Sequence, residues 1–231
     1  MTDPVLALLA EPAPVSAPAL LGATIAGKGV TLRITEVEAY FGPTDPGSHG
    51  HRGPTARNRH LFGPPGTLYA YRSYGIHTCV NVVSGAEGVS SGSLLRAAEV
   101  VDGVATARER RGPSVADVAL ARGPGNLGSA VGAVLGEDDG TGLLDGRGPY
   151  LLTLAPGLEA RIASSGPARV IEELLSETRS GPGGVGTVPR ISRGPRTGVG
   201  GVAGGAGYPW RFWLTGEPTV SPYRRHPGAL D

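Results

Sequence analysis

The chain contains little cysteine, lysine or aromatic side chain. Its 231 residues include one Cys (Cys79), one Lys (Lys28) and 5% aromatic residues. A single cysteine cannot form an intrachain disulfide or a cysteine-based zinc site. The lone lysine leaves little scope for Schiff-base chemistry. These absences exclude a disulfide scaffold and a zinc finger, and they are typical of a protein that works in a reducing compartment.

Long hydrophobic runs are also missing. No window approaches the roughly 18 apolar residues that a membrane-spanning helix needs. The N-terminus has Asp3 where a secretory signal needs positive charge, and Glu11 and Pro12 interrupt the apolar residues that follow. We therefore expect a soluble, intracellular protein.

Charge is nearly balanced overall but unevenly distributed. The formal net charge is +1, which does not by itself indicate a nucleic-acid-binding protein. Residues 161–231, however, hold nine Arg and five acidic residues. This excess provides either a local basic surface for a polyanion or a solvated C-terminal tail.

Glycine and proline are plentiful, with 39 Gly and 21 Pro. This favours many short elements and long loops, and the pattern predicts one α+β domain around a largely antiparallel sheet. The expected strands span residues 30–40, 67–74, 76–83, 93–100, 149–154 and 211–214. The expected helices span residues 4–10, 17–26, 102–111, 114–122 and 126–135, with Asp102 as the N-cap of the third. Residues 179–207 are expected to be mostly irregular, and a strand fragment at 197–199 remains open.

Two carboxylates and a phenol share one face of the strand predicted over residues 30–40. Side chains alternate along a strand, so Glu36, Glu38 and Tyr40 point the same way. Such a carboxylate pair can perform acid–base chemistry on a glycosidic bond or bind a divalent metal. Alternatively, one or both carboxylates pair with Arg33, Arg57 or another guanidinium.

The loop and hairpin that follow are rich in rings. His49 and His51 form a His-x-His pair, which is weak evidence for a metal site without a third ligand. Tyr69 and Tyr71 share one strand face, and we expect Tyr69 to pack in the core. Tyr74 falls at the hairpin tip, where packing explains it poorly, so it is a candidate wedge for insertion between stacked bases.

Ordered motifs carry a family resemblance. The chain resembles the alkyladenine (3-methyladenine) DNA glycosylase family over roughly residues 18–222. The motifs that carry it are Glu36-Val37-Glu38-Ala39-Tyr40, His49, Arg57-Asn58, Gly66-Thr67-Leu68-Tyr69-Ala70-Tyr71, Tyr74-Gly75, Asn81, Leu94-Leu95-Arg96, Arg122-Gly123-Pro124-Gly125-Asn126-Leu127, Gly194-Pro195-Arg196-Thr197-Gly198-Val199-Gly200 and Pro209-Trp210-Arg211-Phe212. Each motif alone would be weak evidence, but the set in this order is strong.

The resemblance implies roles for particular residues. Glu38 would activate the attacking water, and Arg96 and the main-chain carbonyl of Thr197 would help to hold that water. The other implied roles are pocket walls that stack on an extruded base (Tyr40, His49 and Tyr71), a wedge that fills the vacated place in the duplex (Tyr74, with Ile76 beside it) and an amide at the purine edge (Asn81).

The resemblance also implies an architecture and an activity. We expect a strongly curved sheet with flanking helices and a protruding hairpin, with the glycosylase domain over residues 17–222 between an N-terminal segment (1–16) and a C-terminal tail (223–231). The implied enzyme is a monofunctional glycosylase without lyase activity that acts on damaged purines in double-stranded DNA, with no cofactor and no metal. We expect a monomeric, cytoplasmic, nucleoid-associated bacterial protein.

Two other classes of function remain open. One is a glycoside or nucleoside hydrolase that uses Glu36 and Glu38 as its carboxylate pair. The other is a non-catalytic nucleic-acid-binding module built on the basic C-terminal third. Tyr74 at the hairpin tip distinguishes the glycosylase hypothesis from the sugar-hydrolase hypothesis, because only a DNA glycosylase needs a wedge. Glu38 separates the glycosylase from the binding module.

Overall fold

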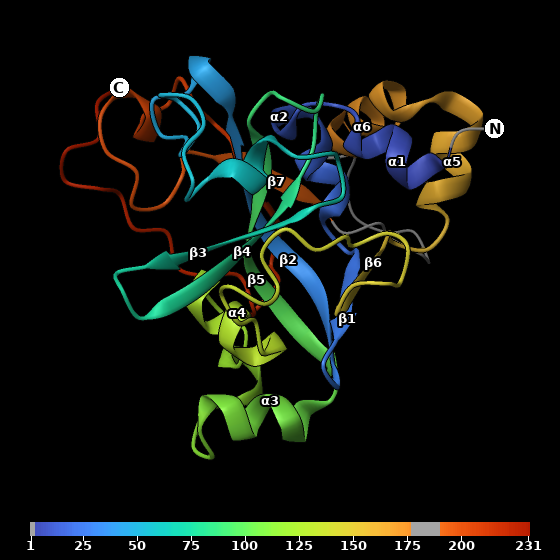
Figure 1. Ribbon diagram of the computed structural model, residues 1–231, viewed down its shortest axis with the longest axis vertical. Helices are drawn as coiled ribbons and strands as arrows, with labels where there is room; N and C mark the ends of the chain where they lie inside the picture. The colour runs from blue at the N-terminus through green and yellow to red at the C-terminus, as the bar shows by residue number, and fades with distance from the viewer. Residues whose placement is uncertain (1–2, 177–189) are drawn as a thin grey trace.

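A curled, open antiparallel sheet forms the centre of the computed structural model, which describes residues 3–176 and 190–231 (Figure 1). Its main path runs in the order β3-β4-β5-β2-β1-β6, and β8 pairs with both β2 and β7. The strands are β1 (Thr24–Gly27), β2 (Val30–Phe41), β3 (Leu68–Ser73), β4 (His77–Val83), β5 (Ser91–Asp102), β6 (Tyr150–Thr153), β7 (Ile191–Gly194) and β8 (Arg211–Leu214). The predicted α+β class and largely antiparallel, curved sheet are confirmed.

Strand β2 is the axis of the fold. One edge pairs with β5 along its length, while the other pairs first with β1 and then with β8. Its second half, from Thr35 to Ala39, is buried at every residue, including Glu36 and Glu38. Two register shifts against β5 flank Glu36, and they leave Arg96 without a directly opposed partner. Such bulges often re-aim side chains beside active sites.

Helices pack on the sheet in two groups. The described helices are α1 (Pro4–Leu9), α2 (Ala13–Ser16), α3 (Val104–Arg111), α4 (Pro124–Val131), α5 (Leu158–Ser165) and α6 (Pro167–Ser176). The first group, α1, α2, α5 and α6, gathers at one end of the molecule, and α3 with α4 lies at the other (Figure 1). One continuous apolar core joins both groups to the sheet. The main β strands predicted from the sequence agree with the structure, as does the hairpin of β3 and β4.

Three local predictions were wrong. Residues 17–26 do not form a helix: a 3-10 turn over Ala17–Leu20 is followed by β1, because pairing with β2 and β6 decides the conformation there. Residues 114–122 contain only a 3-10 turn at Asp117–Ala119, since Ala116 is extended. Asp102 is the last residue of β5, and Gly103 is the N-cap of α3, where a Cβ would lie 2.0 Å from the Gly29 carbonyl oxygen.

Five of the described strands and helices were not predicted: the short strands β1 and β7 and the helices α2, α5 and α6. Residues 179–189 of the stretch expected to be irregular lie outside the described residues. In the rest of that stretch, β7 is a strand, whereas residues 197–199 are not: residues 197–198 form a turn and Val199 has no regular structure. Among the helices that the structure describes, none has the length and apolar character needed to cross a membrane.

Candidate active site

A cavity of about 440 Å³ opens between β2, the β3–β4 hairpin and the loop after β7. This volume is within the range of small-molecule pockets. Eight of the nine sequence-predicted site residues line it: Glu38, Tyr40, His49, Tyr71, Tyr74, Asn81, Arg96 and Thr197. The ninth, Ile76, lies outside the cavity, close to Tyr74 on the hairpin, and its side chain is 72% exposed.

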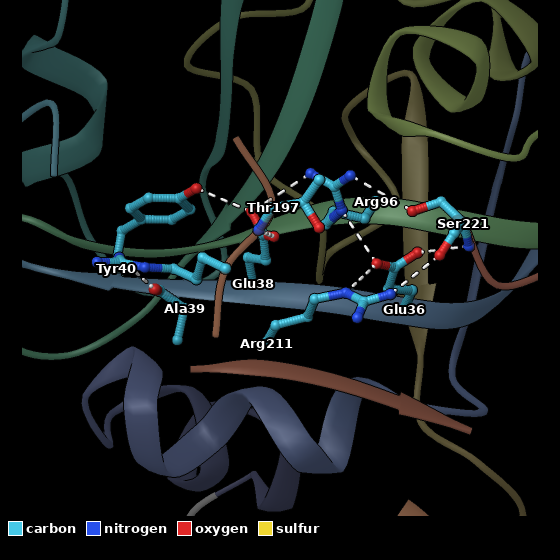
Figure 2. A network of polar contacts seen from close by, with 9 residues as sticks. Glu36, Glu38, Ala39, Tyr40, Arg96, Thr197, Arg211 and Ser221 are labelled. Atoms are coloured by element: carbon cyan, nitrogen blue, oxygen red, sulfur yellow. Dashed lines mark hydrogen bonds and ion pairs between the residues drawn. The ribbon is translucent and has the colours of Figure 1, made fainter. Parts of the chain in front are cut away.

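Glu38 lies on the cavity wall, and its side chain is completely buried. Oε1 accepts a hydrogen bond of 2.6 Å from the Thr197 main-chain N–H. Oε2 accepts from the Tyr40 hydroxyl at 2.9 Å and from Arg96 Nη1 at 3.4 Å (Figure 2). An ionised carboxylate has about four acceptor positions, so these three donors leave one free. Glu38 therefore keeps the capacity to accept a hydrogen bond from one further group.

Glu36, two residues earlier, also accepts three hydrogen bonds from protein groups. Its Oε1 accepts from Arg211 Nε at 2.6 Å and Arg96 Nε at 3.1 Å, and Oε2 accepts from the Ser221 N–H at 2.8 Å (Figure 2). It does not line the cavity. The expected alternative of guanidinium pairing thus holds for both carboxylates: Glu36 pairs with Arg96 and Arg211, and Glu38 pairs with Arg96. Arg33 instead pairs with two other acids, at 2.7 Å in each case.

Arg96 links the two carboxylates. Burial on its own would lower the pKa of its guanidinium, but the charges of Glu38 and Glu36 outweigh that effect and raise the pKa. Arg96 is therefore permanently charged. Its Nη2 also donates to the Ser221 hydroxyl at 3.3 Å. Glu36 and Glu38 thus both hold the Arg96 guanidinium in place. Of these two carboxylates, only Glu38 lines the cavity together with Arg96.

Tyr40 is held against a buried cation. The guanidinium carbon of Arg196 lies 4.4 Å from the Tyr40 ring centroid. Arg196 has no exposed surface, and its two terminal nitrogens donate to both oxygens of Asp45 at 2.6 Å. Burial, and then the charge of Glu38, raise the pKa of the Tyr40 hydroxyl well above its usual value. Tyr40 therefore remains a protonated donor to Glu38.

Three rings form another part of the wall. His49 packs edge-on to Tyr71 with centroids 4.6 Å apart, and Tyr71 stacks with Tyr69 at 6.0 Å. The Tyr69 hydroxyl lies 3.0 Å from His49 Nδ1. Burial, and then the positive charge of Arg57, lower the pKa of His49. His49 is therefore neutral at pH 7, and this wall presents uncharged, electron-rich rings.

Tyr74 is almost fully exposed, at 92%, in a tight hairpin turn closed by a bond of 3.1 Å from Ile76 N–H to the Ser73 carbonyl. Its φ of +50° lies in the left-handed region, which is unfavourable for a bulky residue. The following Gly75, with φ of +73°, adopts this region readily. An aromatic side chain is thus presented to solvent in a conformation that costs stability.

Asn81 has contacts both with the backbone and with the cavity. It is 5% exposed and lines the cavity, while its Nδ2 donates to the Tyr69 carbonyl at 3.0 Å. This bond orients the amide. Asn81 is thus both a backbone-bonded buried residue and part of the cavity surface.

Comparison with known proteins assigns the chain to a family. The family model described as Methylpurine-DNA glycosylase (MPG) matches residues 7–218. The chain belongs to the methylpurine-DNA glycosylase family. A protein of Leifsonia xyli subsp. xyli is 45% identical over 222 residues, which cover 92% of this chain and 89% of that protein. A protein of Nocardia farcinica is 44% identical over 227 residues (96% and 92%), and one of Mycobacterium tuberculosis is 44% identical over 211 residues (89% and 87%).

The curated name of each of these three relatives is "Putative 3-methyladenine DNA glycosylase". The family resemblance read from the sequence motifs is therefore confirmed. A methylpurine-DNA glycosylase is a hydrolytic glycosylase whose substrate is DNA.

Several residues of this glycosylase site were not predicted. Arg196 and Asp45 support Tyr40, Arg211 and Ser221 hold Glu36, and the Tyr69 hydroxyl contacts His49. Tyr69 is buried as expected, at 1% exposed. Arg196 and Arg211 stood within the motifs that carried the resemblance, which was the only signal available for them.

Much of the C-terminal positive charge is used within the protein. Arg196 pairs with Asp45, Arg211 with Glu36, and Arg225 with Asp231. The basic surface that remains after this pairing is therefore smaller than the number of arginines in the sequence suggests. DNA binding by this glycosylase should therefore depend on few phosphate contacts, with a correspondingly shallow dependence on salt.

The lowered pKa of His49 predicts a pH-dependent contribution to stability. Unfolded histidine has a pKa of about 6.5, so below that pH the unfolded chain takes up a proton that folded His49 resists. This contribution to the free energy of unfolding is present above pH 6.5 and is lost as the pH falls. We expect His49→Gln to lose less stability than wild type between pH 7.5 and pH 5.5, measured by urea unfolding. Equal losses in the two proteins would contradict this role for His49.

Proposed function

We propose that this protein is a monofunctional DNA glycosylase that flips alkylated or deaminated purines out of duplex DNA and hydrolyses their N-glycosidic bond in base excision repair. The observation that carries the proposal is that a carboxylate, a ring-lined cavity and an exposed aromatic residue occur together. Glu38 and Tyr74 line the same cavity, although Glu38 is fully buried and Tyr74 is 92% exposed.

The cavity suits a flat, electron-poor base. Alkylated purines are cationic, and they gain from the faces and edges of neutral rings. Tyr40, His49 and Tyr71 provide such rings, and the lowered pKa of His49 avoids a repulsive imidazolium at pH 7. Asn81 offers an oriented amide for an edge of the base. Extrusion of a base costs a few kcal/mol, which stacking in such a pocket offsets.

Glu38 is the general base in this proposal. It takes a proton from a water whose oxygen attacks the sugar C1′, while the electrons of the glycosidic bond pass to the departing base. The three donors around Glu38 hold its carboxylate in one orientation. Because Glu38 is closed to solvent in the free protein, we expect the longest contact, 3.4 Å to Arg96, to open and admit the water when a base fills the cavity.

Tyr74 is the wedge. A side chain that inserts between base pairs has to be apolar, rigid and exposed before binding, and Tyr74 and Ile76 both satisfy this at the hairpin. The wedge role is supported by the exposure of Tyr74 and by the fact that Tyr74 and Glu38 line the same cavity. We expect the protein to act on duplex DNA as a monomer.

A hydrolytic mechanism without a lyase step is favoured by the position of the only lysine. The Lys28 ammonium pairs with Asp138 at 2.7 Å and lies over the Tyr150 ring, and Lys28 does not line the cavity. A Schiff base needs a free amine at the reacting sugar. A hydrolase that uses Glu36 and Glu38 as a carboxylate pair is disfavoured. Glu36 is hydrogen-bonded by Arg96, Arg211 and Ser221, and it does not line the cavity.

Product analysis tests this proposal directly. The protein is incubated with duplex DNA that has been treated with a methylating agent, and the released bases are separated by chromatography. We expect free methylated purines and intact abasic sites, with strand breaks appearing only after alkali. Strand cleavage without alkali would contradict the monofunctional proposal, and release of no base would contradict the glycosylase proposal itself.

A further inference from the structure

The last eight residues run along the glycine-rich loop that closes one side of the cavity. We define residues 224–231 as the strap. The Gly198 N–H donates to the Arg224 carbonyl at 3.0 Å, and the Gly201 N–H donates to the Gly228 carbonyl at 2.8 Å. In return, the Leu230 N–H donates to the Gly201 carbonyl at 3.0 Å, within a parallel bridge. The strap therefore pairs with the loop almost as an added strand.

The strap also closes on itself and on the end of the loop. Asp231 accepts two bonds from Arg225, at 3.2 and 3.0 Å, and one of 3.1 Å from the Ala206 N–H. Arg225 also donates to the Ala229 carbonyl at 3.1 Å. These contacts brace the strap as a compact unit. Its exposed charges are thus used to keep the strap in place.

Missing side chains in the loop allow the strap to approach. A Cβ on Gly205 would lie 1.8 Å from the Leu230 carbonyl oxygen, and its next nearest atoms also belong to the strap. A Cβ on Gly200 would lie 3.1 Å from the His226 ring. Gly205 itself has ordinary backbone angles, with φ of −90° and ψ of −176°. Glycine is therefore needed at position 205 for space rather than for its conformational freedom.

The loop held by the strap is part of the site. Residues 197–200 line the cavity, and the Thr197 N–H makes the shortest contact of Glu38, at 2.6 Å. Arg196, the residue before Thr197, is fixed by its ion pair with Asp45. The strap fixes the residues after Thr197, starting at Gly198. Thr197 thus sits between two anchors, of which one is the strap.

We propose that residues 224–231 are a positioning element of the catalytic site: they hold the 198–206 loop in the shape that sets Thr197 against Glu38. This inference rests on the proposed glycosylase function. It assigns a role in the chemical step to a C-terminal segment that touches neither the base nor the reacting atoms. Geometric errors of about 1 Å in such supports can cost about 10²-fold in rate.

A matched pair of Gly→Ala variants tests the strap. Gly205→Ala places its new methyl group against the strap, whereas Gly207→Ala, two residues later, meets nothing within 4 Å. We expect Gly205→Ala to lose hydrogen-exchange protection at the Gly198 and Gly201 amides and to lower single-turnover base release by about tenfold or more. Gly207→Ala should match the wild type in both measurements. Binding to a DNA duplex with a stable abasic analogue should change far less than the rate of base release.

Deletion of residues 224–231 completes the experiment. We expect the deletion to reproduce the Gly205→Ala effects, and the Gly205→Ala change to add nothing further in the shortened protein, because both act through the same contact. Unchanged hydrogen-exchange protection at the Gly198 and Gly201 amides in the deletion variant would contradict the proposal that the strap holds the loop. Lost protection with an unchanged rate of base release would overturn its catalytic role. The exchange measurement needs no substrate, so it remains decisive even if the chain releases no base.

Discussion

Glu38→Gln is expected to abolish base release while preserving DNA binding. The amide still accepts the Thr197 N–H at the position of Oε1, but it cannot take a proton from water. Loss of a general base typically costs about 10²- to 10⁴-fold in rate. The measurement is single-turnover release from an alkylated duplex, alongside a binding titration with the same duplex. The prediction is for a large loss in rate with little change in affinity.

The Glu38 experiment needs a control variant and a measurement of stability. Glu99→Gln is a suitable control, because Glu99 is a partly exposed carboxylate that pairs with Arg33 on β2, away from the cavity. It should release bases at the wild-type rate. Undiminished release by Glu38→Gln would remove Glu38 from the mechanism. A thermal unfolding curve for each variant separates lost chemistry from lost structure.

Tyr74→Asn is expected to make the protein more stable and less active. Asn tolerates the left-handed conformation that Tyr74 adopts at φ of +50°, so the substitution should relieve about 1 kcal/mol of strain. The side chain is 92% exposed, so little packing is lost. Without a wedge, part of the few-kcal/mol cost of extrusion is no longer offset, and base release should fall by about one to two orders of magnitude. Urea unfolding and single-turnover release measure the two effects.

The matched variant at this position is Tyr74→Phe. It retains the ring and the strain, so both its stability and its activity should stay close to wild type. A Tyr74→Asn protein that releases bases at the wild-type rate would mean that Tyr74 is not the wedge. One that is less stable would mean that the turn does not store the strain inferred from its backbone.

Local patterns predicted the elements that carry the cavity residues. Alternation along residues 30–40 placed Glu36 and Glu38 on one face, and the structure joins both to Arg96. Ring-rich strands around Tyr74-Gly75 predicted the hairpin. These features depend on neighbours in sequence or on a period of two, and both can be read from a chain without its fold.

Long-range polar partners could not be predicted in the same way. Arg196 and Asp45 are 151 positions apart, and Arg211 and Glu36 are 175 apart. Nothing in local spacing tells a buried arginine from a surface one, so both interpretations of the C-terminal arginines, a basic surface and a solvated tail, assumed that they are exposed. The helix α6 is different, because Val170, Ile171 and Leu174 follow helical spacing and are buried. That signal was present in the sequence, but no prediction was made from it.

Four buried charges at the site, on Glu36, Glu38, Arg96 and Arg211, sum to zero and neutralise one another at contact distance. These four charges together produce only a weak electrostatic field outside the site. They therefore neither attract a cationic base over a long distance nor bind mobile counterions. Ionic strength should accordingly affect only the binding of DNA, through the shallow dependence expected above, and leave the bond-breaking rate of the assembled complex nearly unchanged.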